Sequence, residues 1–129
     1  FAQTPKTATA VVTGAATVAD DNPTNTVELL TAGADGALVT RLTAMPRGTV
    51  TASSLVLFLQ KSGQTTQRLL DSELMAAHTV AATTAIPETA FGNVSDSTPL
   101  RLEAGDKLFV GSQVALAAGI VFAAQWMDY

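Results

Sequence analysis

The chain has 129 residues, no cysteine and a formal net charge of −4 from 7 basic and 11 acidic side chains. The lack of cysteine excludes disulfides and thiolate metal sites, and the basic residues are scattered singly, which argues against a nucleic-acid partner. The longest apolar run, 114–124, is shorter than the roughly 20 residues of a transmembrane helix, so we expect no membrane partner either.

The first ten residues are rich in threonine and alanine and contain one proline. This composition predicts an extended N-terminal arm over 1–10 that becomes ordered only against a partner. An acidic turn follows at 20–22, with the sequence Asp-Asp-Asn. It lacks the ligand spacing of a calcium loop, so we interpret it as a solvated turn before a strand, and its role stays open.

Two pairs of apolar segments in the first half are each joined by turn residues. Segments 24–31 and 37–44, rich in valine, leucine and threonine, flank an Asp35-Gly36 pair, which predicts a β-hairpin. Segment 54–60 is followed by a Lys-Ser-Gly-Gln-Thr turn and by 66–70, which predicts a second hairpin.

The pattern is less regular from residue 71 onward. An Asp-Ser cap, an early glutamate and good helix formers predict one short helical turn near 72–77. Residues 79–85 are expected to form a strand that ends before Pro87, and 87–99 form a loop dense in turn residues.

The last third has two further strand signals. Apolar and charged residues alternate over 100–110 around Ala104-Gly105-Asp106, which predicts a third hairpin, and 120–127 reads as a closing strand. Short strands separated by turn signals, with almost no helix, predict an all-β sandwich or barrel formed by a single domain over 1–129.

Two of these strands are apolar on both faces, namely 54–60 and 120–127. A strand of a two-layer sandwich normally buries one face only, so something must cover the other, and a second copy of the chain is the expected cover. A charged fraction of 14%, against about 25% in typical soluble domains, also indicates a surface that other protein covers. The candidate interface residues are Val56, Phe58, Phe109, Val121 and Met127.

No constellation of catalytic, cofactor-binding or metal-binding residues is recognisable. His78 is the only histidine, no Gly-x-Ser-x-Gly elbow accompanies it, and no glycine-rich phosphate loop is present. The glutamates lie on separate predicted elements, so a carboxylate hydrolase would need two of them brought together by the fold. We therefore expect a protein that is not an enzyme and uses no cofactor or metal.

Two resemblances add to this interpretation. The sequence "PLRLEAGDKLFV", followed by the final "IVFAAQWMDY", resembles the terminal hairpin and last strand of trimeric jelly-roll modules of the tumour necrosis factor and C1q-like family. This resemblance implies an antiparallel, jelly-roll-like β-sandwich of about eight strands that forms a homo-oligomer, with a trimer favoured.

The segments "AQTPKT", "TNTVELLTAG", "LDSELMAAHT" and "LEAGDKLFVG" resemble small structural proteins of tailed-phage and prophage heads. This resemblance implies a virion protein that decorates or cements the outer surface of a capsid. Such a protein is assembled in the cytoplasm of the bacterial host and contacts the major capsid protein.

The alternative is a carbohydrate- or receptor-binding module. Loops on a rigid β-scaffold often carry recognition, and the loop over 87–99 has three side chains suited to it. These candidates are Phe91, Asn93 and Asp96.

Overall fold

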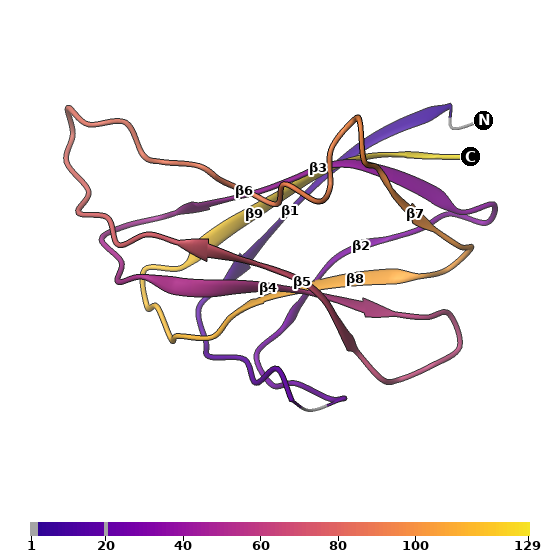
Figure 1. Ribbon diagram of the computed structural model, residues 1–129, viewed down its shortest axis with the longest axis horizontal. Helices are drawn as coiled ribbons and strands as arrows, with labels where there is room; N and C mark the ends of the chain where they lie inside the picture. Colours follow the sequence, from indigo (N-terminus) through magenta and orange to yellow (C-terminus); the bar gives the residue numbers. More distant parts are fainter. Residues whose placement is uncertain (1–2, 20) are drawn as a thin grey trace.

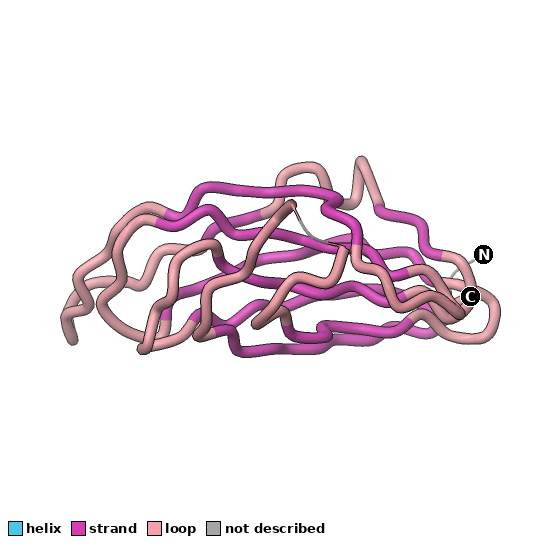
Figure 2. Tube along the Cα trace, turned by 90° about the horizontal axis from the view of Figure 1, so that it is seen from below, coloured by secondary structure: helices cyan, strands magenta, loops and turns pink. Residues whose placement is uncertain are grey.

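Two antiparallel β-sheets pack face to face in the computed structural model, which describes residues 3–19 and 21–129 (Figures 1 and 2). Nine strands and no helix occur in this described part of the chain. The strands are β1 (Thr4–Val12), β2 (Val27–Thr31), β3 (Ala37–Pro46), β4 (Ser53–Gln60), β5 (Arg68–Met75), β6 (Thr89–Ala90), β7 (Leu100–Leu102), β8 (Lys107–Ser112) and β9 (Ile120–Asp128).

The strand order is that of a jelly roll. Sheet A has the order β1-β9-β3, and the short strands β6 and β7 lie one after the other along the remaining edge of β3. Sheet B has the order β2-β8-β4-β5. The chain thus passes repeatedly from one sheet to the other, as in the two interleaved Greek keys of a jelly roll. The expected antiparallel, jelly-roll-like sandwich is confirmed.

Only one of the three expected hairpins forms. β4 pairs with β5 as predicted, whereas β2 and β3, on either side of Asp35-Gly36, lie in different sheets, and so do β7 and β8. Gly36 and Gly105 do adopt the positive φ of a tight turn, at 91° and 77°. The glycine turns reverse the chain as expected, but each strand leaving them pairs with a partner distant in sequence, so the two hairpin predictions were wrong.

Three further expectations about local structure were also wrong. Residues 72–75, expected within a helical turn, belong to β5 because pairing with β4 overrides their helix propensity. Residues 79–85 form an exposed loop and no strand. The expected N-terminal arm is instead β1 from Thr4 onward, an edge strand paired with β9 along its whole length, while residues 1 and 2 lie outside the described part.

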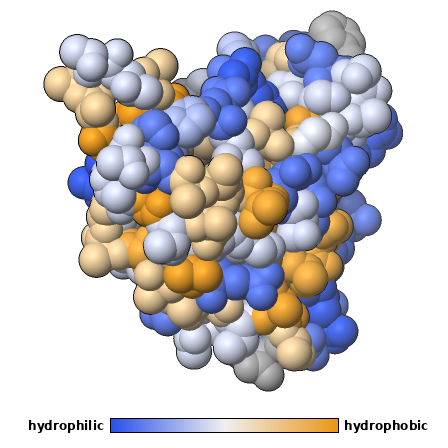
Figure 3. Space-filling model, turned by 60° about the vertical axis from the view of Figure 1, so that its left-hand side comes forward, coloured by the Kyte–Doolittle hydropathy of each residue, from blue (hydrophilic) through white to orange (hydrophobic). Residues whose placement is uncertain are grey.

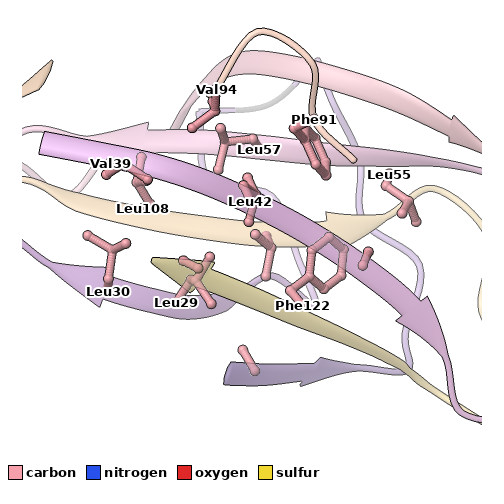
Figure 4. Close-up of a cluster of buried hydrophobic side chains, with 14 of the residues drawn as sticks. Leu29, Leu30, Val39, Leu42, Leu55, Leu57, Phe91, Val94, Leu108 and Phe122 are labelled. Carbon is pink, nitrogen blue, oxygen red and sulfur yellow. The ribbon is translucent and has the colours of Figure 1, made fainter. Parts of the chain in front are cut away.

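The inward faces of the two sheets form one apolar core (Figure 4). Leu42 of β3 and Phe122 of β9 meet Leu55, Leu57 and Leu108 of sheet B, each at most 1% exposed. Alternation of inward apolar and outward side chains produces this core directly. The loop after β6 adds Phe91, whose ring centroid lies 6.4 Å from that of Phe122 in a tilted arrangement.

A buried carboxylate holds together three turns at one end of the sandwich, on the right of Figure 1. Asp106, in the β7–β8 turn, accepts hydrogen bonds from the Ser62 N–H (3.1 Å) in the β4–β5 turn and from the Glu103 N–H (3.0 Å) in its own turn. The Lys61 ammonium lies 2.8 Å from its Oδ2 atom. The Asp106 carbonyl also accepts the Ala32 N–H at 2.8 Å, which brings in the β2–β3 turn.

A second buried carboxylate closes the same end. Asp128 at the end of β9 lies 2.7 Å from the Lys6 ammonium of β1 and accepts the Gly33 N–H at 3.2 Å. Burial disfavours the ionised form of both Asp106 and Asp128, but the lysine and N–H partners of each outweigh it and hold both pKa values below the ordinary aspartate value.

These lowered pKa values predict acid sensitivity. A carboxylate whose pKa is lowered on folding stabilises the protein above its unfolded pKa, about 3.9, and that contribution disappears as the pH falls through the folded pKa. We expect the free energy of unfolding to be flat from about pH 7 to pH 5 and to fall below about pH 4. Urea titrations followed by the fluorescence of buried Trp126 measure it.

Asp106→Asn tests the assignment of this effect. We expect the variant to lose about 1–3 kcal/mol at neutral pH, because it removes a charged acceptor of three hydrogen bonds, and to show a shallower fall below pH 4. Asp96→Asn, in an exposed loop, is the matched control and should behave as the unmodified chain. An unchanged acid dependence in Asp106→Asn would contradict the assignment.

Candidate functional site

The outer face of sheet B is covered by the chain's own residues over β4, whereas Leu74 of β5 stays exposed. The segment 13–19, between β1 and β2, runs beside β8, where the Ala16 N–H donates to the Ser112 carbonyl at 2.7 Å. Val56 and Phe58 of β4 form one buried cluster with Ala16 of this segment, and both are 0% exposed. The second apolar face of β4 is therefore buried within one chain, whereas the sequence led us to expect cover by a second copy.

The other interface candidates have different environments. Phe109 of β8 packs at the margin of the same covered cluster and is half-buried. Val121 and Met127 of β9 are half-buried as well, but they lie on the outer face of sheet A, where the register places them opposite Val11 and Pro5 of β1. The structure thus separates the five candidates between two faces, one covered and one open.

The outer face of sheet A is apolar at one end. A row across the sheet joins Val11, Val121 and Met45, and the next row joins Thr9, Ala123 and Thr43. Val11 is 40% exposed and Met45 is 39% exposed, so neither is covered by another part of the chain. Figure 3 shows how apolar side chains gather in patches between hydrophilic ones on the side of the molecule that it presents.

A trough runs along this face beside the segment 86–96, and we call it the sheet A trough. Its apolar half, about 410 Å³, lies between Ile86 and the β3 and β9 side chains Met45, Val121 and Ala123. Its polar half, about 380 Å³, lies farther along the same strands. Thr43 lines both halves, so they adjoin one another.

The polar half carries charged and amide groups from three parts of the chain. Arg41 of β3 donates to both carboxylate oxygens of Glu88, at 3.1 and 3.2 Å. Gln125 of β9 and Asp96 of the following loop also line it. Because Arg41 and Glu88 are both well exposed, their ion pair contributes little to stability and remains available to a ligand or partner.

The three predicted recognition residues are not brought together. Phe91 is 1% exposed and belongs to the core, and its N–H donates to the Leu42 carbonyl at 2.9 Å. Asn93 is exposed and donates through Nδ2 to Asp71 Oδ1 at 3.3 Å, away from the trough. Phe91 and Asp96 both border the polar half of the trough, but only the Asp96 side chain is exposed there. Loop 87–99 therefore buries its aromatic residue, which removes the ring as a ligand-stacking surface.

The scattered carboxylates have separate partners on the surface. Glu28 pairs with Lys107, Glu88 with Arg41, and Glu103 with Lys61. In residues 3–19 and 21–129, no three histidine or acidic side chains lie close enough to hold a metal ion. That same part of the chain has no helix long and apolar enough to cross a bilayer.

The acidic turn at 20–22 falls partly outside the described residues, because Asp20 is not described. Asp21 lies 3.4 Å from the Arg68 guanidinium, and its carbonyl accepts the Gln67 N–H at 2.7 Å. These contacts connect the turn to the start of β5.

Part of the trough could be expected from the sequence. Alternation in 37–44 places Arg41 on the outer face of its strand, as the structure has it, but nothing local indicated that Glu88 would lie opposite it. No local pattern distinguishes Ile86 and Met45 either. Ile86 and Met45 face the same trough only because of where the long connection between β5 and β6 returns to the sheet.

The chain matches no protein-family model, no curated protein and no solved structure. Inferences about its function therefore rest on its own residues.

The cover over sheet B predicts unequal effects of two truncations on its outer face. Phe58→Ala should lower the free energy of unfolding by about 3–5 kcal/mol, because it empties a fully buried site. Leu74→Ala, on β5 and 71% exposed, should change it by less than about 0.5 kcal/mol. Urea unfolding of both variants checks the difference, and equal effects would mean that segment 13–19 does not cover β4 in solution.

Proposed function

We propose that this protein is a non-enzymatic structural protein of a virion, which decorates or cements a tailed-phage capsid by docking the outer face of sheet A on neighbouring protein. One observation carries the proposal. The chain covers Val56 and Phe58 on the outer face of sheet B with its own segment 13–19, but it leaves the apolar row across sheet A, with Val11 and Met45 at its ends, open to solvent. Exposed apolar surface of this kind is typical of interaction sites.

The outer face of sheet A is too small to form a stable interface by itself. Strands of nine residues are about 30 Å long, and three strands span about 15 Å, which gives roughly 450 Å². A stable interface buries about 800 Å² on each partner. Segment 79–88 borders the trough through Ile86, is exposed at every residue and is uncharged up to Glu88. We propose that it supplies the remaining area.

The capsid and the trimer rest on the two sequence resemblances. The jelly-roll order of the strands is the organisation implied by the resemblance of 99–110 and 120–129 to trimeric modules, and so supports a homotrimer. The low charged fraction of 14% supports a surface that contacts protein. The capsid's outer surface is the proposed location, and the major capsid protein is the proposed partner.

Native mass spectrometry tests the self-association. We expect the mass of three chains, and we expect the double variant Val11→Asp/Met45→Asp to weaken association at least ~10-fold by placing charge in the interface. Leu74→Asp is the matched control, since it charges an exposed apolar position on the other sheet, and should remain trimeric.

Co-sedimentation with tailed-phage capsid shells tests the proposed binding to the capsid. The unmodified chain and Leu74→Asp should sediment with the shells, and the double variant should stay in the supernatant. A monomer that binds no shell would overturn the proposal.

The polar half of the trough favours a second candidate, a carbohydrate-binding module. Arg41, Glu88, Asp96 and Gln125 line one hollow of about 380 Å³ and offer both donors and acceptors to sugar hydroxyls. A glycan array tests this candidate: we expect hits that Asp96→Ala and Arg41→Ala abolish and that Leu74→Asp retains. An array without hits would remove it.

A further inference from the structure

Asp71 differs from the two buried carboxylates at the end of the sandwich. Asp106 and Asp128 each have a lysine ammonium within 2.8 Å of Oδ2. The Oδ2 atom of Asp71 is also buried, but no donor reaches it among the described residues. The other oxygen, Oδ1, accepts the Ser72 N–H at 2.8 Å and the Asn93 side-chain amide at 3.3 Å.

A cavity adjoins this carboxylate. It has a volume of about 190 Å³ and lies between β5 and the loop after β6, where Val94 lies near Leu57 (Figure 4). Its other apolar walls are Leu70 and Leu100, and Asp71 and Asn93 supply its polar wall. Leu70 is 42% exposed, which places one wall of the cavity at the surface.

The chemistry of the walls defines the ligand. A buried carboxylate oxygen without a donor is costly, and each such group in a native protein requires an explanation. Apolar walls beside a carboxylate complement a cationic N–H donor carried on an apolar stem. The volume would hold about six water molecules at ~30 Å³ each, which is room enough for a four-carbon chain. The chain itself uses lysine, an ammonium on four methylenes, at its other two buried carboxylates.

We infer that the Asp71 cavity binds a primary alkylammonium group, with the ammonium at the Asp71 carboxylate and the alkyl stem against Leu70 and Leu100. The group comes either from a free alkylamine or from a lysine side chain of a neighbouring protein. The net charge of −4 favours the approach of a cation. This inference is independent of the proposed docking of sheet A, because the cavity shares no wall with the apolar half of the trough.

Chemical-shift titration of the ¹⁵N-labelled full chain tests the inference. The probes are n-butylammonium and Nα-acetyl-lysine N-methylamide, with n-butanol as the neutral analogue. We expect an ammonium probe to shift the amide signals of Asp71, Asn93 and Val94, and n-butanol to bind at least ~10-fold more weakly. Binding of the lysine derivative supports a protein side chain as the source, and binding of butylammonium alone supports a free amine.

Two variants and one control complete the experiment. Asp71→Asn keeps the shape of the side chain and should weaken binding at least ~10-fold. Leu70→Trp crowds the surface-exposed wall while retaining the carboxylate, so it gives an independent loss of binding should Asp71→Asn fold poorly. Asp35→Asn, at an exposed acidic residue of the β2–β3 turn away from the cavity, should bind as the unmodified chain.

The inference is overturned if neither ammonium probe shifts these amides. It is also overturned if n-butanol or folded Asp71→Asn binds equally well. Neither result depends on the oligomeric state, so the outcome is separable from failure of the proposed capsid function.

Discussion

The buried carboxylate of Asp106 is the interaction on which this jelly roll most depends. Successive strands cross between the sheets, so most turns are not held by hairpin hydrogen bonds and need another partner. Asp106 provides one for three turns at once, through Lys61, the Ser62 and Glu103 N–H groups and its own carbonyl. Because the carboxylate is buried, these partners are necessary to keep it ionised.

The close packing around Asp106 also explains why the preceding residue, Gly105, is a glycine. A side chain at Gly105 would place its Cβ 2.6 Å from Ser62 Oγ, and the positive φ of this residue would strain any other amino acid. Gly105 therefore allows the β7–β8 turn to approach the β4–β5 turn closely enough for Asp106 to reach the Ser62 N–H. Gly105 is therefore required for two reasons, its positive φ and its close approach to Ser62.

The two outer faces of the sandwich differ because of one connection. Segment 13–19 lies beside β8 and helps to bury Phe58, which makes the β4 part of the outer face of sheet B part of the folding core, while Leu74 of β5 stays exposed. No described segment does the same for the row of Val11, Val121 and Met45 on sheet A. The segment 86–96 borders this row without covering it and so produces a trough. The asymmetry supports an interaction role for sheet A. It also explains why β4 and β9, which are both apolar on two faces, differ: the chain buries the second face of β4, whereas the second face of β9 lines the trough.

The amino-acid sequence by itself determined the class of the fold, most strand positions and the location of the reversals. Alternating apolar residues specify strands such as β4 and β9, and Gly36 and Gly105 specify tight turns, because both effects act over a few neighbouring residues. Only the tertiary structure decided that β2 and β3, like β7 and β8, would separate into different sheets. It alone placed Ala16 over Phe58 and Glu88 beside Arg41. These arrangements join residues some 40 or more positions apart, so they depend on which surfaces bury one another in the complete fold, and no local pattern encodes that choice.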